Sequence, residues 1–260
     1  MLEADQRRAI ATALTRQVSI ISGGPGVGKT TSVRILVELL ERRGAPYVLL
    51  SPTGKAAKRL SEATLREAYT IHRQLFSLDR QRQQMGSQSR GPVELFLPGD
   101  AVIVDEASMV DLSLLAWLLR SVRPQTRLIF VGDKDQLASV GPGSVLRDLI
   151  ASGRIPVTLL TVIKRQGAGS PIVEAAHAIN HGHLPVARST AAGDLYIVRA
   201  KPAKDDDGMH AQRLVVESAV RLGAQVLSPQ HTSSVGVSAL NRALQARLNP
   251  PLPGKPEVHL

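Results

Sequence analysis

The chain has 260 residues, 43% of them hydrophobic and none of them cysteine, and its formal net charge is +10. This length suffices for one large α/β domain or two smaller ones, and the lack of cysteine excludes disulfides, cysteine zinc sites and thiol catalysis. No apolar run approaches the ~18 residues of a membrane helix, and the acidic, polar N-terminus lacks the pattern of a signal peptide. We therefore expect a cytoplasmic protein with no membrane partner.

Short apolar runs without polar alternation predict strands that are buried on both faces, as in a parallel sheet. These runs are 18–21, 47–50, 101–104 and 128–131. Helical patterns lie between and after them, at 31–43, 55–66, 112–122, 144–151, 171–180 and 237–248. Strand–helix alternation of this kind predicts a doubly wound α/β sheet that binds ligands at the carboxyl ends of its strands.

Two parts of the chain interrupt the alternation. The polar, turn-rich stretch 77–99 is typical of a mobile surface excursion. After Arg165 the pattern changes to a glycine hinge at 167–169 and a charged loop at 200–208, and a new strand is predicted to open at Val226.

The positive charge is concentrated in one stretch. Between Lys55 and Arg90 there are eight basic and three acidic residues, a net charge of +5. Such an excess favours a polyanion partner such as nucleic acid. An arginine-rich composition, with 24 arginines to 8 lysines, explains the charge equally well.

Residues 23–30 read GGPGVGKT and fit the phosphate-binding pattern G-x-x-x-x-G-K-[ST] between a predicted strand and a predicted helix. Glycines let the backbone wrap phosphates closely, and the amides and helix N-terminus form an anion hole. We expect Lys29 to reach the β- and γ-phosphates and the Thr30 hydroxyl to ligate Mg²⁺, so the predicted cofactors are ATP and Mg²⁺. The alternative is a glycine turn without a ligand.

Asp105 and Glu106 directly follow the predicted strand 101–104. An Asp at a strand end can hold the Mg²⁺ shell, and an adjacent Glu can orient and deprotonate the attacking water. A plain acidic turn is the alternative. The pair favours hydrolysis over phosphoryl transfer to a small molecule, and so weighs against a P-loop kinase.

Two further residues are catalytic candidates. Gln136 follows the predicted strand 128–131 and would sense the γ-phosphate or the water, although the segment also fits a type I turn. Arg165 precedes the hinge and would supply positive charge to the transition state across a domain cleft. Taken alone, Arg165 is indistinguishable from a surface arginine.

These elements in this order resemble the superfamily 1 helicases, specifically the RecD-type branch: the alpha subunit of exodeoxyribonuclease V and its stand-alone relatives. The resemblance is carried by SPTGKAA from Ser51, TIH from Thr70, DEASM from Asp105, GDKDQL from Gly132 and AHAINHG from Ala176. By this resemblance, the nucleotide contacts are Gln6, Gly23, Gly24, Pro25, Gly26, Val27, Gly28, Lys29, Thr30 and Thr31. The single-stranded DNA contacts are Pro52, Thr53, Gly54, Lys55, Thr70 and His72.

The resemblance implies ATP-driven 5′-to-3′ movement on single-stranded DNA, action at duplex junctions, roles in DNA repair and recombination, and nuclease partner subunits. It divides the chain into a first RecA-like ATPase domain at 1–165, a connecting helical region at 166–224 and an incomplete start of a second RecA-like domain at 225–260. It also places a pin-like insertion, against which the duplex splits, at 77–99. Few aromatic residues are available for base stacking near this half, namely Tyr69, Phe76, Phe96 and Trp117, and Trp117 is expected to belong to the core.

Three departures from the family pattern matter. Lys164 stands where the family has an aromatic residue that stacks on the adenine, and Ala138 stands where proline is usual. The chain also lacks the family's last two motifs, which complete the second domain and supply a second arginine to the γ-phosphate. We therefore expect a truncated form, whose alternative function is a nucleotide- and DNA-binding module without efficient ATPase or unwinding activity.

Overall fold

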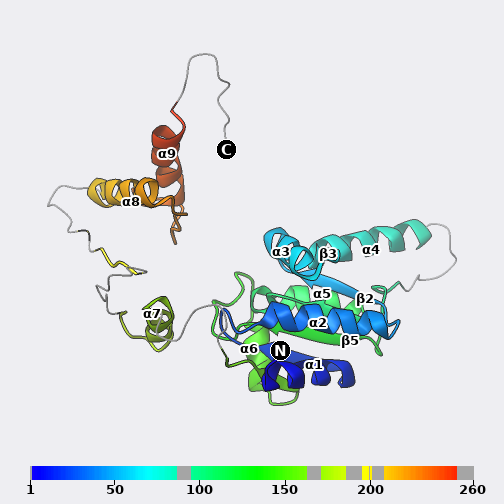
Figure 1. Cartoon of the computed structure of the whole chain (residues 1–260). Coiled ribbons are helices and arrows are strands. Elements are labelled where there is room, and N and C mark those ends of the chain that lie inside the picture. The colour runs from blue at the N-terminus through cyan, green and yellow to red at the C-terminus, as the bar shows by residue number, and fades with distance from the viewer. Residues whose placement is uncertain are drawn as a thin grey trace. The chain divides into compact units, whose positions relative to one another are not determined.

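The computed structural model describes residues 2–86, 95–162, 171–185, 195–198, 200 and 208–250 (Figure 1). The chain divides into two compact units, Met1–Pro185 and Val186–Leu260, and each is described by itself. Within the described ranges, no helix combines the length and apolar character needed to cross a membrane.

The first unit is built on a six-stranded sheet in the order β3-β2-β4-β5-β1-β6, with every neighbouring pair parallel. The strands are β1 (Val18–Ser22), β2 (Tyr47–Ser51), β3 (Ala68–Thr70), β4 (Ala101–Val104), β5 (Arg127–Gly132) and β6 (Val157–Leu159). The four predicted strands are confirmed to within one residue at either end. The edge strands β3 and β6 have three residues each, too few to show a periodicity in the sequence.

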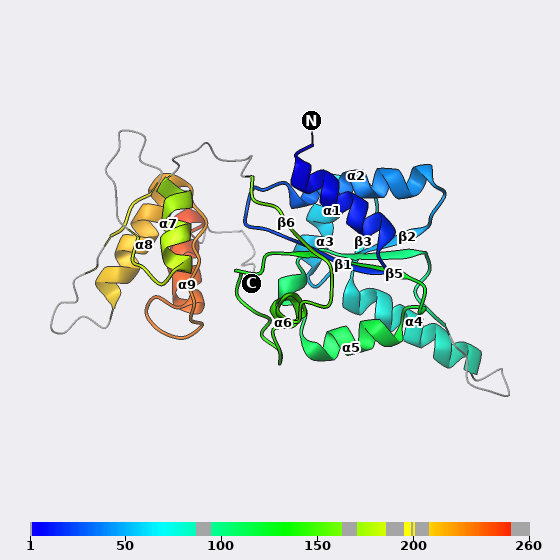
Figure 2. The same cartoon turned by 90° about the horizontal axis from the view of Figure 1, so that it is seen from below.

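Helices cover both faces of this sheet, because successive side chains of a strand point to opposite sides. These helices are α1 (Ala4–Thr15), α2 (Lys29–Arg42), α3 (Gly54–Thr64), α4 (Ile71–Gly86), α5 (Leu112–Arg120) and α6 (Val145–Ala151). In β4, Val102 and Val104 pack with α4, α5 and α6, whereas Ala101 and Ile103 pack with α1, α2 and α3. Figure 2 shows these two groups of helices on opposite sides of the sheet. The first unit also contains a short 3₁₀ turn, η1 (Ala107–Met109), and helix α7 (Pro171–Asn180). The predicted α/β class is therefore confirmed as a three-layer P-loop fold.

The six predicted helices all form, with ends shifted by at most two residues. The stretch 77–99 differs from its prediction, because α4 continues through Gly86. Ile71, Leu75 and Leu78 are buried at helical spacing. The many arginines and glutamines on the outer face of α4 made this amphipathic pattern hard to recognise in the sequence. Residues 87–94 of this stretch lie outside the described part. Residues 95–99 then return to the core, where Leu97 is 1% exposed.

The second unit contains α8 (Met209–Leu222) and α9 (Val237–Leu248). The sequence predicted α9 as a helix, whereas α8 lies in the predicted helical region 166–224 but was not assigned bounds of its own. The strand predicted at Val226 is wrong, because residues 224–228 have no regular secondary structure. A strand needs a hydrogen-bonding neighbour, and the described range 208–250 holds no other strand to provide one.

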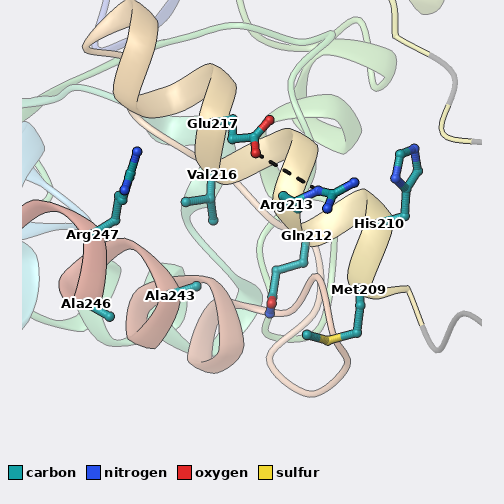
Figure 3. Close-up of a pocket in the computed structure, with 9 residues that line it drawn as sticks. All are labelled: Met209, His210, Gln212, Arg213, Val216, Glu217, Ala243, Ala246 and Arg247. Atoms are coloured by element: carbon teal, nitrogen blue, oxygen red, sulfur yellow. Dashed lines mark ion pairs between the residues drawn. The ribbon is translucent and has the colours of Figure 1, made fainter.

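An open groove of about 770 Å³ lies between α8 and α9 (Figure 3). Arg213 and Glu217 of α8 form an exposed ion pair across one turn, with 4.0 Å between Nε and Oε1. Arg247 of α9 lines the same groove. No residue that the sequence predicts as a nucleotide or DNA contact lines it, so the candidate site lies in the first unit.

Candidate nucleotide and DNA site

The strand order brings the predicted site segments together along one edge of the sheet. Parallel strands end at the same edge, and ligands bind there in open α/β sheets. The register pairs Ser51 with Thr70, Leu50 with Val104, Val104 with Phe130 and Ser22 with Gly132. Along this edge, the segments that follow the strands are 71–72 after β3, 52–55 after β2, 105–106 after β4, 133–136 after β5 and 23–30 after β1.

The loop from Gly23 to Thr30 connects β1 to α2 and depends on glycine at defined positions. Gly26 and Gly28 have φ values of 78° and 86°, in the left-handed region that side-chain-bearing residues rarely adopt. A Cβ on Gly23 would lie 2.6 Å from the Leu160 carbonyl oxygen, so the backbone here passes too close to the residue that follows β6 for any side chain. By contrast, a Cβ on Gly24 would meet nothing within 4 Å. The loop is a backbone cradle at the N-terminus of α2.

Lys29 and Thr30 begin α2, and Lys29 is directed back over the loop. Its ammonium donates hydrogen bonds to the carbonyl oxygens of Gly23 at 2.6 Å and Gly24 at 2.9 Å. The lysine nitrogen therefore lies at the mouth of the cradle. The side chain of Thr30 is half-buried and that of Thr31 is exposed.

Gln6 of α1 is 1% exposed and lies directly against the loop. Its Nε2 donates to the Gly28 carbonyl oxygen at 3.2 Å, and its Oε1 accepts from the Glu3 amide at 3.1 Å. The predicted base-reading glutamine is therefore tied both to the start of α1 and to the phosphate loop.

Asp105 and Glu106 leave β4 in the middle of the edge. The Asp105 amide donates to the Leu50 carbonyl oxygen at 2.9 Å, which holds the turn against β2. Glu106 has a φ of 53°, an unusual left-handed conformation for a residue with a long side chain. Burial and the neighbouring Glu106 carboxylate raise the pKa of Asp105 to about 6, while the charge of Lys29 opposes this rise. Asp105 and the phosphate-loop lysine are thus close enough to interact.

A hydrogen bond connects the segment after β4 with the segment after β5. The Ser108 hydroxyl donates to Gln136 Oε1 at 2.8 Å. Asp133 is 6% exposed and its Oδ1 accepts from the Asp135 amide at 3.0 Å, which shapes the turn. Sequence reasoning missed Ser108 as a site residue, and only its place two residues after the acid pair hinted at a role. Arg165 and Lys164 lie outside the described residues.

The candidate DNA contacts lie at the starts of two helices that follow neighbouring strands. Thr53 caps α3, its Oγ1 accepting from the Ala56 amide at 3.2 Å, and Gly54 and Lys55 form the first turn. Thr70 Oγ1 accepts from the Arg73 amide at 3.2 Å at the start of α4. Lys55 and His72 are exposed. Pro52 precedes Thr53, so all six predicted residues lie on one half of the edge.

Among the described residues, no group of three or more His, Cys, Asp or Glu side chains is arranged to hold a metal. A Mg²⁺ site of the nucleotide type uses one or two protein oxygens together with phosphate oxygens and water. Thr30 and Asp105 are the side chains at the edge that suit such a shell.

The arrangement along the edge defines a P-loop nucleotide-binding domain. A family model described as an AAA domain matches residues 1–199, so the chain belongs to that family. The ATP-dependent RecD2 DNA helicase of Deinococcus radiodurans is 36% identical over 252 residues, which cover 96% of this chain and 33% of that protein. The RecBCD enzyme subunit RecD of Mycolicibacterium smegmatis is 39% identical over 243 residues, which cover 84% of this chain and 42% of that protein. The resemblance to the RecD-type branch is thereby confirmed.

The chain spans 33% and 42% of the length of these two relatives. A solved structure, the Pif1 helicase from Candida albicans, matches 83% of this chain and 54% of its own with a TM-score of 0.52. Its sequence identity is 16%, so this match supports the fold alone. The P-loop fold of this family implies nucleotide binding at the loop after β1.

Proposed function

We propose that this chain is the motor region of an ATP-dependent DNA helicase, which hydrolyses ATP as it moves 5′ to 3′ on single-stranded DNA. Its RecD2 and RecD relatives are named as a DNA helicase and as a subunit of the RecBCD enzyme. Duplex junctions would be its substrate, other repair or recombination subunits its partners, and the cytoplasm its location. Residues 1–165 would form the first motor domain, with a pin at 77–99, and 225–260 would begin the second after the connecting region 166–224.

One observation carries this proposal. The strand order places the acid pair after β4 between the phosphate loop and the candidate DNA contacts after β2 and β3. The acid pair, which would respond to the γ-phosphate, would therefore lie next to both ATP and DNA. A motor must transmit a change at the phosphates to the DNA on which it moves, and this arrangement suits that task. An ATPase that does not move on DNA has no need of it.

The residues present fit ATP with Mg²⁺. The cradle excludes side chains at Gly23, and its lysine nitrogen lies among backbone carbonyl oxygens. Hard oxygen donors from Thr30 and Asp105 suit Mg²⁺. Bound Mg-ATP would supply the phosphoanhydride bond whose hydrolysis drives movement.

In the proposed mechanism each candidate site residue has a distinct role. Lys29 would bind the β- and γ-phosphates, and Thr30 and Asp105 would hold the metal. Glu106 would accept the proton of the attacking water at its carboxylate. Gln136, held by Ser108 at 2.8 Å, would couple the phosphate to the DNA contacts. Gln6 would contribute to base recognition, and Arg165 would neutralise charge in the transition state.

The test is the rate of ATP hydrolysis by these 260 residues, with and without oligothymidylate. The helicase proposal expects at least tenfold stimulation by the oligonucleotide. ATP and DNA binding with negligible stimulated turnover would instead support a binding module without efficient ATPase activity. Absence of nucleotide binding would overturn both.

A further inference from the structure

Three aromatic rings gather on the outer surface of α4 and α5. The Phe76 ring lies edge-on to Trp117, with 4.9 Å between ring centroids and an interplanar angle of 79°. The His72 ring lies 6.3 Å from Phe76 and 6.2 Å from Trp117. The whole chain has only one tryptophan, three tyrosines and three phenylalanines, so this group concentrates a scarce residue type. Figure 2 shows α4 and α5 side by side on the same side of the sheet.

The group combines an exposed ring with a rigid support. Phe76 is 61% exposed. Trp117, which the sequence assigned to the core, is half-buried beside it. The Trp117 Nε1 donates to Asp79 Oδ2 at 3.1 Å, and Asp79 also accepts from Arg82 at 2.7 Å. Because these contacts fix the tryptophan, the phenylalanine ring is held in place without being covered.

The surroundings of the ring are cationic. His72, Phe76 and Arg80 are four residues apart, so they share one face of α4, and all three are exposed. Arg73, also exposed, has its guanidinium carbon 5.3 Å from the Tyr69 ring centroid. Asp79 is the only acidic residue of α4, and it is engaged with Arg82 and Trp117. An exposed ring among arginines suits a ligand that has both a flat apolar face and a negative charge.

We propose that Phe76, supported by Trp117 and His72, is a stacking platform for a base of single-stranded DNA. The platform continues the candidate DNA track, because the predicted contacts Thr70 and His72 lie at the start of α4 and Phe76 is one helical turn further. Aromatic stacking is indifferent to sequence, since every base has a π-face, and adjacent arginines attract the phosphates. The charge favours nucleic acid over an apolar protein segment as the occupant. This inference rests on the proposed function and adds a base-contacting residue to it.

The experiment compares two fluorescein-labelled oligonucleotides of equal length, oligothymidylate and an abasic strand that keeps every phosphate. Binding to the full chain is measured by anisotropy for wild type, Phe76→Ala, Phe76→Leu and Phe76→Tyr. Leu119→Ala, at an exposed apolar residue of the neighbouring helix α5, is the matched control. We expect Phe76→Ala and Phe76→Leu to weaken oligothymidylate binding about tenfold. Phe76→Tyr and Leu119→Ala should bind oligothymidylate within twofold of wild type, and every variant should bind the abasic strand within twofold of wild type.

Emission from Trp117, the sole tryptophan, is a second measurement at the platform itself. Oligothymidylate should quench this emission, and the abasic strand should not. Thermal unfolding of each variant verifies that the fold is retained. The platform proposal would be wrong if Phe76→Ala weakened binding of both oligonucleotides equally, or if it left the affinity for oligothymidylate unchanged. Either result would leave the helicase proposal in place. An unchanged affinity would point to an apolar protein partner for Phe76. If wild type binds neither strand, the proposed function itself fails.

Discussion

The carboxyl edge of the sheet has a nucleotide half, with the phosphate loop, and a candidate DNA half, with the segments after β2 and β3. Backbone atoms form most of the first half, and side chains form most of the second. In the nucleotide half, glycines adopt positive φ, and Gly23 lies too close to the Leu160 carbonyl oxygen to carry a side chain. The Lys29 ammonium donates to backbone carbonyl oxygens of the same loop. The candidate DNA half is formed by residues at the starts of α3 and α4, where the side chains of Lys55 and His72 are exposed. The backbone half constrains the identity of several residues, whereas the side-chain half constrains mainly charge and shape. Substitutions should therefore have sharp effects on the first half and graded effects on the second.

The largest effect is expected at the acid pair. Glu106→Gln removes the proton acceptor but keeps the side-chain shape, so turnover should fall by a factor on the order of 10² to 10⁴. ATP affinity should change by less than about threefold, because the phosphate contacts remain. Steady-state hydrolysis and titration with a fluorescent ATP analogue measure the two quantities. Asp135→Asn is the control at the same edge, and preserved turnover in Glu106→Gln would remove Glu106 from the role of base.

Next comes a matched pair of glycines in the phosphate loop. Gly23→Ala would place a Cβ 2.6 Å from the Leu160 carbonyl oxygen, whereas Gly24→Ala meets nothing within 4 Å. Overpacking of this kind costs roughly 1–3 kcal/mol. We expect Gly23→Ala to lower the melting temperature and weaken ATP binding at least tenfold, and Gly24→Ala to stay near wild type. Calorimetry and nucleotide titration test this pair, and equal behaviour of the two variants would refute the cradle geometry.

On the DNA half the expected effect is smaller and depends on salt. Lys55 lies in the first turn of α3 at the edge, while Lys58, one turn further, is 4.0 Å from Glu62. Lys55→Ala should weaken oligothymidylate binding several-fold and reduce the slope of log K against log salt by about 0.7, the value for one phosphate contact on a single strand. Lys58→Ala should leave that slope unchanged. If both variants shift the slope alike, the attraction is diffuse charge and not a track at the edge.

The smallest effect concerns the opposite edge of the sheet, where Tyr47 begins β2. Arg66 and Tyr47 both bond to Glu41, and these hydrogen bonds, Arg66 first, lower the pKa of Glu41 to about 2 from 4.5. A depressed folded-state pKa means that the contribution to stability is present above about pH 4.5 and is lost as the pH falls toward 2. Arg66→Gln should therefore lower the melting temperature slightly at pH 7 and by less at pH 2.5, where part of the contribution has already been lost. ATP turnover at neutral pH should not change, because this edge holds no site residue. If the melting temperatures of wild type and Arg66→Gln differed by the same amount at pH 7 and at pH 2.5, the low pKa of Glu41 would not be due to Arg66.

Much of the nucleotide half was predictable because its chemistry is local. A Cβ on Gly23 would lie 2.6 Å from a neighbouring carbonyl oxygen, and Gly26 and Gly28 adopt positive φ, so these positions require glycine. The phosphate loop can therefore be recognised from consecutive residues of the sequence. Buried strands likewise reveal themselves as unbroken apolar runs. The hydrogen bond from Ser108 to Gln136 was not predictable, because it joins residues 28 positions apart and depends on β4 and β5 being neighbours.

The sequence by itself determined the α/β class, the phosphate loop, the acid pair and the strands of the sheet's interior, since each depends on residues adjacent in the chain. Only the tertiary structure decided the strand order, the extension of α4 through half of a stretch expected to be irregular, and the absence of a strand at Val226 within the described range 208–250. It also placed Trp117 beside an exposed Phe76 and not within the core. These features depend on which segments pair across long loops, and such pairing is determined by packing over the whole domain and not by local preference.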